Sequence, residues 1–247
     1  MNIKTNTYGN LCSLCYDLRL FYAQPPEFGF FATCIDMHPG RALEAMSGSG
    51  RLLIPLLQRG YTVDGVDCSP DMLARCHARC KQLKLTPKIY EQALENLSLP
   101  HQYATIIIAL GSFQLISDQT QALQALKNLQ AHMLDDGNLF IDIFVPETTG
   151  NPCSTSVEKV DDNTQLRLTK KNIFDHNKQI AQVLCTYELI TNGIVQQTEQ
   201  EMLQIIWRTD EQWANLLTQA GLKIVKIHDE PYGKDSVSRV LHARRIA

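Results

Sequence analysis

The stretch that decides the fold is residues 43–51, LEAMSGSGR, which leaves one apolar segment, makes a glycine-bearing turn and enters another. Gly48 and Gly50 carry no Cβ, so a ligand that approaches this turn meets bare backbone. The free N–H groups of a helix start would face the same ligand. Such a turn favours a nucleotide site, although many tight strand-to-helix turns use glycine for geometry alone. The sequence on either side of the turn has to decide between a nucleotide site and a turn that uses glycine for geometry alone.

On both sides of this turn, short apolar segments alternate with amphipathic ones. Residues 103–110 contain the unbroken apolar run Ile106, Ile107 and Ile108, which is typical of a central parallel strand. Pro70 with Ser69 before it predicts a helix start and its N-cap, and residues 135–137 predict the end of a later helix. We predict strands at 41–46, 61–66, 87–90, 103–110 and 138–145, with helices at 51–59, 70–83 and 118–134. This alternation predicts an α/β fold with a parallel sheet and right-handed crossovers.

Residues 147–206 change to a period of two. Apolar residues alternate there with mostly polar neighbours, at Ala181, Val183, Cys185, Tyr187 and Leu189. The Asn-Gly pair at 192–193 predicts a hairpin turn, and 161–163 and 175–177 predict two more. We therefore expect an antiparallel β-meander inserted after the fifth strand.

Helix signals return after the insert. Thr209 and Gln212 form a capping box, Gly221 closes the helix, and strands are expected at 222–228 and 236–243. The sequence thus divides into an N-terminal cap (1–39), a core (40–146 and 207–247) and a β insert (147–206).

Composition narrows the function classes. The 247 residues carry 23 Lys and Arg against 26 Asp and Glu, a net charge of −3 without a basic block, which argues against a nucleic-acid partner. We expect no membrane partner, because no apolar run reaches the 18 residues of a spanning helix. The N-terminus does not resemble a signal peptide, and eight cysteines then favour a cytoplasmic protein. The pairs Cys12/Cys15 and Cys76/Cys80 are expected as buried thiols rather than as metal ligands.

Asp67 gives the glycine turn its context, because it ends the second predicted strand 17 residues beyond Gly50. An acid near this spacing can bind the hydroxyls of a ribose, with about 1.5–3 kcal/mol per charged hydrogen bond. The alternative role for Asp67 is a favourable charge at the N-terminus of the helix that starts at Pro70.

These residues resemble a known family. The segments 44–51 (EAMSGSGR) and 65–73 (GVDCSPDML) look like motifs of the class I S-adenosylmethionine-dependent methyltransferases. Residues 111–114, 134–140 and 207–222 agree with later segments of that family, in order and at compatible spacing. The resemblance implies a Rossmann-like fold, with a seven-stranded, mostly parallel sheet that has helices on both faces. It also implies S-adenosylmethionine as the cofactor.

The resemblance further assigns roles to matching positions. Glu44 would orient the methionine amino group through water, Gly48 and Gly50 would let the methionine part approach the backbone, and Asp67 would hold the ribose hydroxyls. The remaining contacts implied are Cys68, Met72 and Leu94 around the adenine, Leu110 and Gly111 under the sulfonium, and Tyr16 in the cap.

The chain departs from the family pattern at two positions. Met46 stands where the family usually has glycine, and Ala93 where it often has an acid that contacts the adenine amine. Losing one such hydrogen bond costs on the order of 1 kcal/mol. Two alternatives therefore stay open: a weak or inactive methyltransferase-like protein, and a nicotinamide-dependent oxidoreductase. The second would want a third glycine near Leu53.

The expected substrate is a small molecule with a nitrogen or oxygen nucleophile. Methyl transfer needs alignment more than acid–base machinery, so no catalytic residue is assigned. The aromatic side chains expected near the pocket are Tyr8, Tyr16, Tyr22, Phe113 and Phe144, with core packing as the alternative for each. The resemblance also implies that the β insert covers the pocket or pairs two subunits in a homodimer.

Overall fold

The computed structural model describes residues 3–147, 151–234 and 236–246. Its larger sheet has seven strands in the order β11-β12-β6-β5-β2-β3-β4. The strands from β2 to β6 pair in parallel, while β12 and β11 extend the β6 edge in antiparallel fashion. The bounds are β2 Ala42–Ala45, β3 Val63–Asp67, β4 Ile89–Glu91, β5 Tyr103–Ile108, β6 Met133–Phe144, β11 Leu222–Asp229 and β12 Ser238–Arg245. The predicted Rossmann-like, mostly parallel sheet is confirmed.

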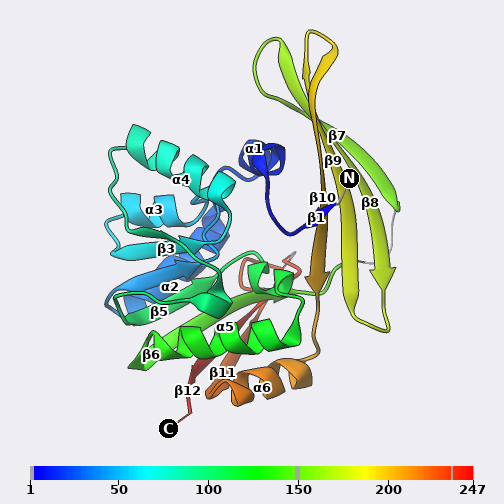
Figure 1. The fold of residues 1–247 in the computed structure, drawn as a ribbon. Helices are drawn as coiled ribbons and strands as arrows, with labels where there is room; N and C mark the ends of the chain where they lie inside the picture. The colour runs from blue at the N-terminus through cyan, green and yellow to red at the C-terminus, as the bar shows by residue number, and fades with distance from the viewer. Residues whose placement is uncertain (1–2, 148–150, 235, 247) are drawn as a thin grey trace.

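Helices cover both faces of this sheet (Figure 1). One buried apolar cluster joins the sheet to α5 (Gln119–Ala131) and α6 (Asp210–Gln219). A second cluster joins it to α2 (Pro25–Met37), α3 (Leu53–Gln58) and α4 (Pro70–Gln82). Two short 3₁₀ turns, η1 (Leu94–Asn96) and η2 (Ser112–Leu115), follow β4 and β5. The sheet therefore has an apolar core on each side, as the unbroken apolar strands predicted.

Polar side chains start three helices where the sequence predicted. The Ser69 hydroxyl accepts the Met72 N–H at 3.2 Å, and the Asp118 carboxylate accepts the Gln121 N–H at 2.8 Å. Thr209 and Gln212 form the capping box of α6, with bonds of 3.2 and 2.7 Å. These bonds satisfy N–H groups that lack an intrahelical partner.

One predicted boundary is wrong. Residues 135–137 do not end the preceding helix, because α5 stops at Ala131 and β6 already starts at Met133. Met133 pairs with Tyr103, and the register then shifts before Asn138 pairs with Thr105. The intervening residues form an irregularity inside the strand. Pairing with β5 therefore overrides the local turn signal of 135–137.

The insert forms a second sheet, as the period of two predicted. Strands β7 (Cys153–Lys159), β8 (Thr164–Asp175), β9 (Ile180–Thr191) and β10 (Ile194–Ile206) make an antiparallel meander. The sequence did not predict its fifth strand, β1 (Lys4–Thr5), which pairs in parallel with β10. The N-terminal segment therefore reaches across to the insert.

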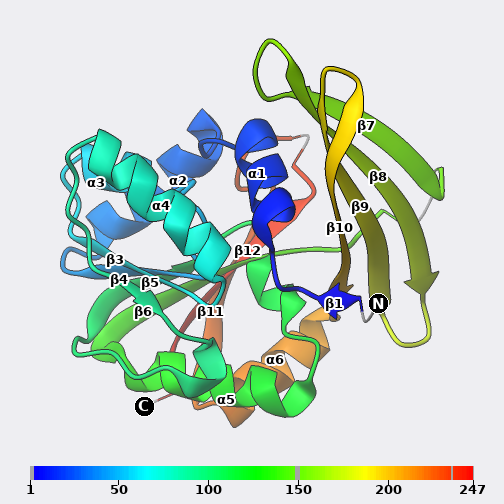
Figure 2. The ribbon, with the colours of Figure 1, turned by 45° about the horizontal axis from the view of Figure 1, so that its top comes forward.

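Helix α1 (Asn10–Arg19) lies between the two sheets (Figure 2). Its Cys12 and Cys15 pack with Leu166 and Tyr187 of the insert, and Cys76 and Cys80 are buried against α3 and the core sheet. The four cysteines are therefore buried thiols, as expected. Among the described residues, no helix is long and apolar enough to cross a membrane.

Candidate functional site

A cavity of about 590 Å³ opens where the carboxyl ends of β2, β3 and β5 face the N-terminal segment and the insert. Parallel α/β sheets bind ligands at this edge. Eight predicted cofactor residues line the cavity: Tyr16, Gly48, Asp67, Cys68, Met72, Leu94, Leu110 and Gly111. Glu44 and Gly50 do not line it.

Asp67 is fixed at the edge of the cavity by backbone donors. The N–H of Gly48 donates to one of its carboxylate oxygens and the N–H of Ser69 to the other, each at 2.8 Å. Burial raises the pKa of Asp67, and these two N–H groups oppose the shift. Each oxygen keeps a lone pair for a further donor such as a hydroxyl. The bond to Ser69 also places Asp67 at the start of α4, as its alternative role predicted, while its contact with a ribose stays a prediction.

The two glycines of the turn have different surroundings. A Cβ at Gly48 would lie 3.8 Å from the Met72 sulfur, in ordinary contact beside the cavity. A Cβ at Gly50 would lie 2.7 Å from the Cys76 sulfur and 3.0 Å from Ile54. Gly50 therefore allows the turn to pack against α3 and α4. Its predicted contact with a cofactor stays a prediction.

Met46 occupies the position where glycine was expected. Its backbone is left-handed, with φ of 60°, a conformation that costs about 1–2 kcal/mol for a residue with a side chain. The side chain packs partly against the main core and lines the cavity without filling it. Ala93 lines the wall near the adenine position expected from the resemblance, and Glu95 adds a carboxyl group to that wall. Sequence reasoning missed Glu95.

A second left-handed turn forms the floor of the cavity at Leu110 and Gly111, with φ of 54° and 64°. The Leu110 N–H donates to the Asp142 carboxylate at 3.0 Å, and the Tyr232 hydroxyl donates to the same oxygen at 2.8 Å. Asp142 is fully buried, and burial raises its pKa to about 6. Sequence reasoning missed Asp142, although an acid inside the apolar segment 139–145 was a visible signal.

Glu44 lies beneath the cavity in a buried polar cluster. Burial raises the pKa of its carboxyl to about 8, and nearby Arg51 opposes the shift. The Arg51 guanidinium is bound by both oxygens of buried Glu27. Arg51 also lowers the pKa of Tyr16, which burial raises to about 12. Within the described part of the chain, one Glu44 oxygen has no hydrogen-bond partner, so this site can accept a donor such as an ammonium group.

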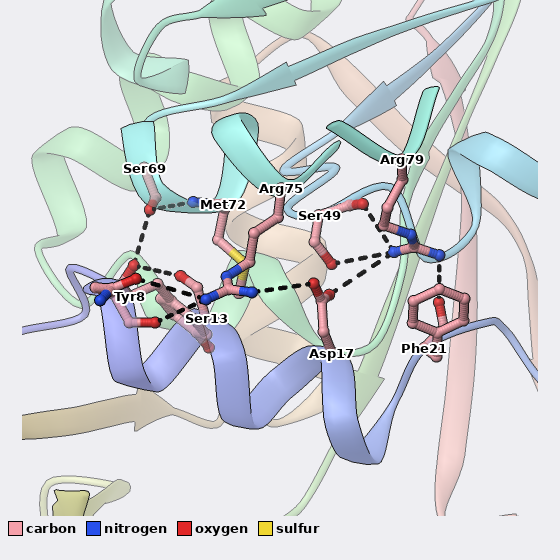
Figure 3. Close-up of polar contacts among 10 residues, drawn as sticks. Tyr8, Ser13, Asp17, Phe21, Ser49, Ser69, Met72, Arg75 and Arg79 are labelled. Carbon is pink, nitrogen blue, oxygen red and sulfur yellow. Dashed lines mark hydrogen bonds and ion pairs between the residues drawn. The ribbon is translucent and has the colours of Figure 1, made fainter. Parts of the chain in front are cut away.

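Polar contacts fasten α1 over the glycine turn (Figure 3). The Ser69 hydroxyl donates to the Tyr8 carbonyl at 2.9 Å. Buried Arg79 donates to the Ser49 carbonyl at 2.9 Å and the Phe21 carbonyl at 2.6 Å, and lies 3.7 Å from Asp17. The α4 helix thus holds the cap and the turn in one arrangement. Arg79 was also missed, although it follows Cys76 by three positions on the buried face of α4.

The far end of the cavity lies under the insert and the N-terminal segment. Its apolar wall comes from Leu115, Ile116, Phe144, Val183, Leu203 and Ile205. Asn6 connects the N-terminal segment to the insert and to η2, because its amide donates to the carbonyls of Gln204 in β10 and Leu115 in η2. Three of the expected aromatics line the cavity: Tyr8, Tyr16 and Phe144. The other two do not, because Phe113 is fully buried in the core and Tyr22 lies beside Arg79.

Comparison with known proteins agrees with this geometry. Residues 42–137 match the family model of the methyltransferase domain. A putative methyltransferase of Geobacillus sp. (strain WCH70) is 25% identical over 103 residues, which cover 42% of this chain and 42% of that protein. The chain thus aligns with less than half the length of this curated relative.

Solved structures share the fold over nearly the whole chain. An S-adenosylmethionine-dependent methyltransferase from Clostridium acetobutylicum has a TM-score of 0.76 at 17% identity, covering 95% of this chain and 98% of that one. The sugar N-methyltransferase KedS8 from Streptoalloteichus sp. has a TM-score of 0.78 at 17% identity, covering 100% and 97%. Residues 42–137 therefore match a methyltransferase domain, and the chain has the fold of S-adenosylmethionine-dependent methyltransferases.

Proposed function

We propose that this protein transfers a methyl group from S-adenosylmethionine to a nitrogen or oxygen of a small molecule. The observation that carries the proposal is the continuity of the cavity, which runs from Asp67 at the end of β3 to the insert strands. One end offers groups suited to a nucleoside, and the other offers a covered space for an acceptor.

Residues in the cavity wall and beside it suit the cofactor in three places. Asp67 presents a fixed carboxylate to the ribose hydroxyls, beside the bare backbone of Gly48. Cys68, Met72 and Leu94 line an apolar slot for the adenine. Glu95 lies two residues from Ala93 and can replace the missing acid there. The unpartnered oxygen of Glu44 offers an acceptor for the amino group of the methionine part, through water, as the resemblance implies.

The chain's contribution to the reaction is alignment and exclusion of water. The cofactor supplies an activated methyl group when bound. The Leu110–Gly111 turn, held by Asp142, sets the floor on which the reacting groups meet. The N-terminal segment and the insert cover the acceptor end through Asn6. Alignment of this kind can lower a barrier by up to about 7–11 kcal/mol without a catalytic acid or base.

The chemistry of the far wall favours an acceptor with an apolar body. Its apolar side chains are accompanied by uncharged polar ones, Asn6, Ser112, Ser117 and Gln121. The ionisable side chains among the described lining residues are all acidic groups, namely the carboxyls of Asp67 and Glu95, the thiol of Cys68 and the hydroxyls of Tyr8 and Tyr16. A neutral or cationic amine or a hydroxyl compound suits this wall better than an anionic one. The likeness to a sugar N-methyltransferase supports the small-molecule class.

Four further points remain proposals. The division into cap, core and insert is supported by the presence of two separate sheets. A homodimer through the insert and a cytoplasmic location rest on the sequence reasoning above. So does the exclusion of nucleic acid as a partner, which follows from the net charge of −3 and the lack of a basic block.

Calorimetric titration with S-adenosylhomocysteine and with NAD tests the class of ligand. We expect the purified chain to bind S-adenosylhomocysteine and not NAD. Protein free of S-adenosylhomocysteine is then incubated with labelled S-adenosylmethionine and a panel of apolar amines, amino sugars and phenols. Transfer to a member of the panel supports the proposal. Cofactor binding without any transfer favours the weak or inactive alternative, and binding of NAD alone overturns the proposal.

A further inference from the structure

A second pocket, of about 350 Å³, lies on the opposite side of β10 from the cavity. The neighbouring residues Ile205 and Ile206 show the change of side, because Ile205 lines the cavity and Ile206 lines this pocket. The insert contributes Lys178 and Gln179 between β9 and its hairpin partner β8. The core contributes the start of α5 and the exposed side of α6. The pocket thus joins the base of the insert to the core.

Arg208 lies buried at the wall of this pocket, and it forms no ion pair with any residue that the structure describes. Its exposed fraction is 9%, and within the described residues both Nη nitrogens lack a hydrogen-bond partner. Burial lowers its pKa, yet a guanidinium keeps its proton at any ordinary pH. The group rests instead on the Trp213 ring, 5.2 Å from the ring centre. A buried charge without a partner is costly, so an anion at this wall would be strongly favoured.

The other groups around the pocket suit an anion as well. The Lys178 side chain is 74% exposed and lies 3.7 Å from Asp175, a loose contact that an incoming anion can share. Amide side chains surround the pocket: Gln119, Gln179, Gln212, Asn215 and Gln219. The nearby acid Asp210 is paired with Arg239 at 2.6 Å. The pocket wall is therefore cationic, with amide N–H groups as additional donors.

We propose that this pocket binds a small oxyanion, a carboxylate or phosphate group, on Arg208 and Lys178. Two oxygens of such a group can accept both N–H bonds of one guanidinium edge, which suits arginine better than lysine. Both Nη nitrogens are closed to solvent in this structure, so the guanidinium must turn toward the pocket to meet the anion, which would give it acceptors that the Trp213 ring cannot supply. The ligand would also connect the insert to α5 and α6, because its contacts come from both.

Intrinsic tryptophan fluorescence can report on this site. The chain has two tryptophans, and both lie there: Trp207 lines the pocket and Trp213 lies under Arg208. Tryptophan emission is followed while inorganic phosphate or acetate is added at constant ionic strength, with chloride as the reference salt. We expect a saturable change with phosphate, acetate or both, and none with chloride. The stronger of the two identifies the preferred oxyanion.

Three variants locate the anion. Lys178→Gln alters an exposed side chain and should weaken binding several-fold without affecting folding. Lys81→Gln on α4 removes the same charge from an exposed position away from the pocket and should bind as the unmodified chain does. Arg208→Gln should lose binding altogether, and if it does not fold, the Lys178→Gln result decides alone. Absence of a saturable change in the unmodified chain, or equal affinity in Lys178→Gln and Lys81→Gln, overturns the proposal.

Discussion

Replacing Gly111 by alanine tests the floor of the cavity. The added Cβ would lie 2.3 Å from the Cε1 atom and 2.6 Å from the Cδ1 atom of Phe144, far inside contact distance. The backbone N–H and carbonyl of Phe144 are both bonded to the Gln114 amide at 2.9 Å, so the backbone is held and only rotation of the ring can relieve the clash. The φ of 64° adds a left-handed strain.

The two contributions can be estimated separately. A left-handed alanine costs about 1–2 kcal/mol. Overpacking in a tight site costs about 1–3 kcal/mol more. We expect Gly111→Ala to lower the free energy of unfolding by about 2–5 kcal/mol in urea titrations. Because Phe144 lines the cavity, the affinity for S-adenosylhomocysteine should fall as well.

Gly60→Ala is the matched control. Gly60 is also left-handed, with φ of 86°, but a Cβ there meets nothing within 4 Å. Gly60→Ala should lower the free energy of unfolding only by the cost of a left-handed alanine, about 1–2 kcal/mol, and should leave the affinity for S-adenosylhomocysteine unchanged. Equal losses of stability in the two variants would show that Phe144 does not restrict Gly111, and the account of the floor would be wrong.

Three further predictions concern charge and capping. The pKa of Asp142 is about 6 in the fold and about 3.9 in an unfolded chain, so the folded state holds the extra proton between these values. The free energy of unfolding should therefore fall by about 2–3 kcal/mol as the pH rises from 4 to 6. In urea titrations, Asp142→Asn should lack this pH-dependent loss. An identical pH profile in the variant and the unmodified chain would contradict the prediction. Glu44, with a pKa of about 8, is mostly protonated at pH 7, and an ammonium group beside it should release that proton. Calorimetry of S-adenosylhomocysteine binding in buffers of different ionisation enthalpy should show up to one proton released, and the same release in Glu44→Gln would rule this out. Ser69→Ala and Asp118→Ala each remove an N-cap and should cost about 0.5–2 kcal/mol. Faster amide exchange at residues 6–12 should appear only in Ser69→Ala, because Ser69, unlike Asp118, also donates to the Tyr8 carbonyl; equal exchange in the two variants would contradict a role for that bond.

The repeating pattern of the core could be predicted because its signals are local. Caps at Ser69, Asp118 and Thr209 mark helix starts within three residues, and the period of two at 180–191 marks a strand of the insert. Pairing of β1 with β10 has no such signal, because Lys4 and Glu201 are brought together only by the completed fold. The early start of β6 was missed for the same reason, since pairing of Met133 with Tyr103 overrides a turn-like sequence.

The candidate site divides in the same way. The glycine turn and Asp67 form one continuous local motif, so their place at the strand ends could be read from spacing. The supports of the site come from distant segments: Asp142 on β6 holds Leu110, and Arg79 on α4 holds Ser49. At Gly50 the motif could not show that the position of an added Cβ is taken by Cys76 and Ile54, and its contact with a ligand stays a prediction. Spacing identifies which residues come near a site and leaves open which of them face it.

The most direct measurement of the central claim is the affinity of Asp67→Ala for S-adenosylhomocysteine by calorimetry. Glu91→Ala is its control, because Glu91 is an exposed acid at the end of the adjacent strand β4. Thermal unfolding of both variants shows whether they remain folded. The account predicts that Asp67→Ala binds at least tenfold more weakly, a loss of about 1.4 kcal/mol, while Glu91→Ala binds as the unmodified chain does. An unchanged affinity in folded Asp67→Ala would contradict the claim that its carboxylate holds the ribose.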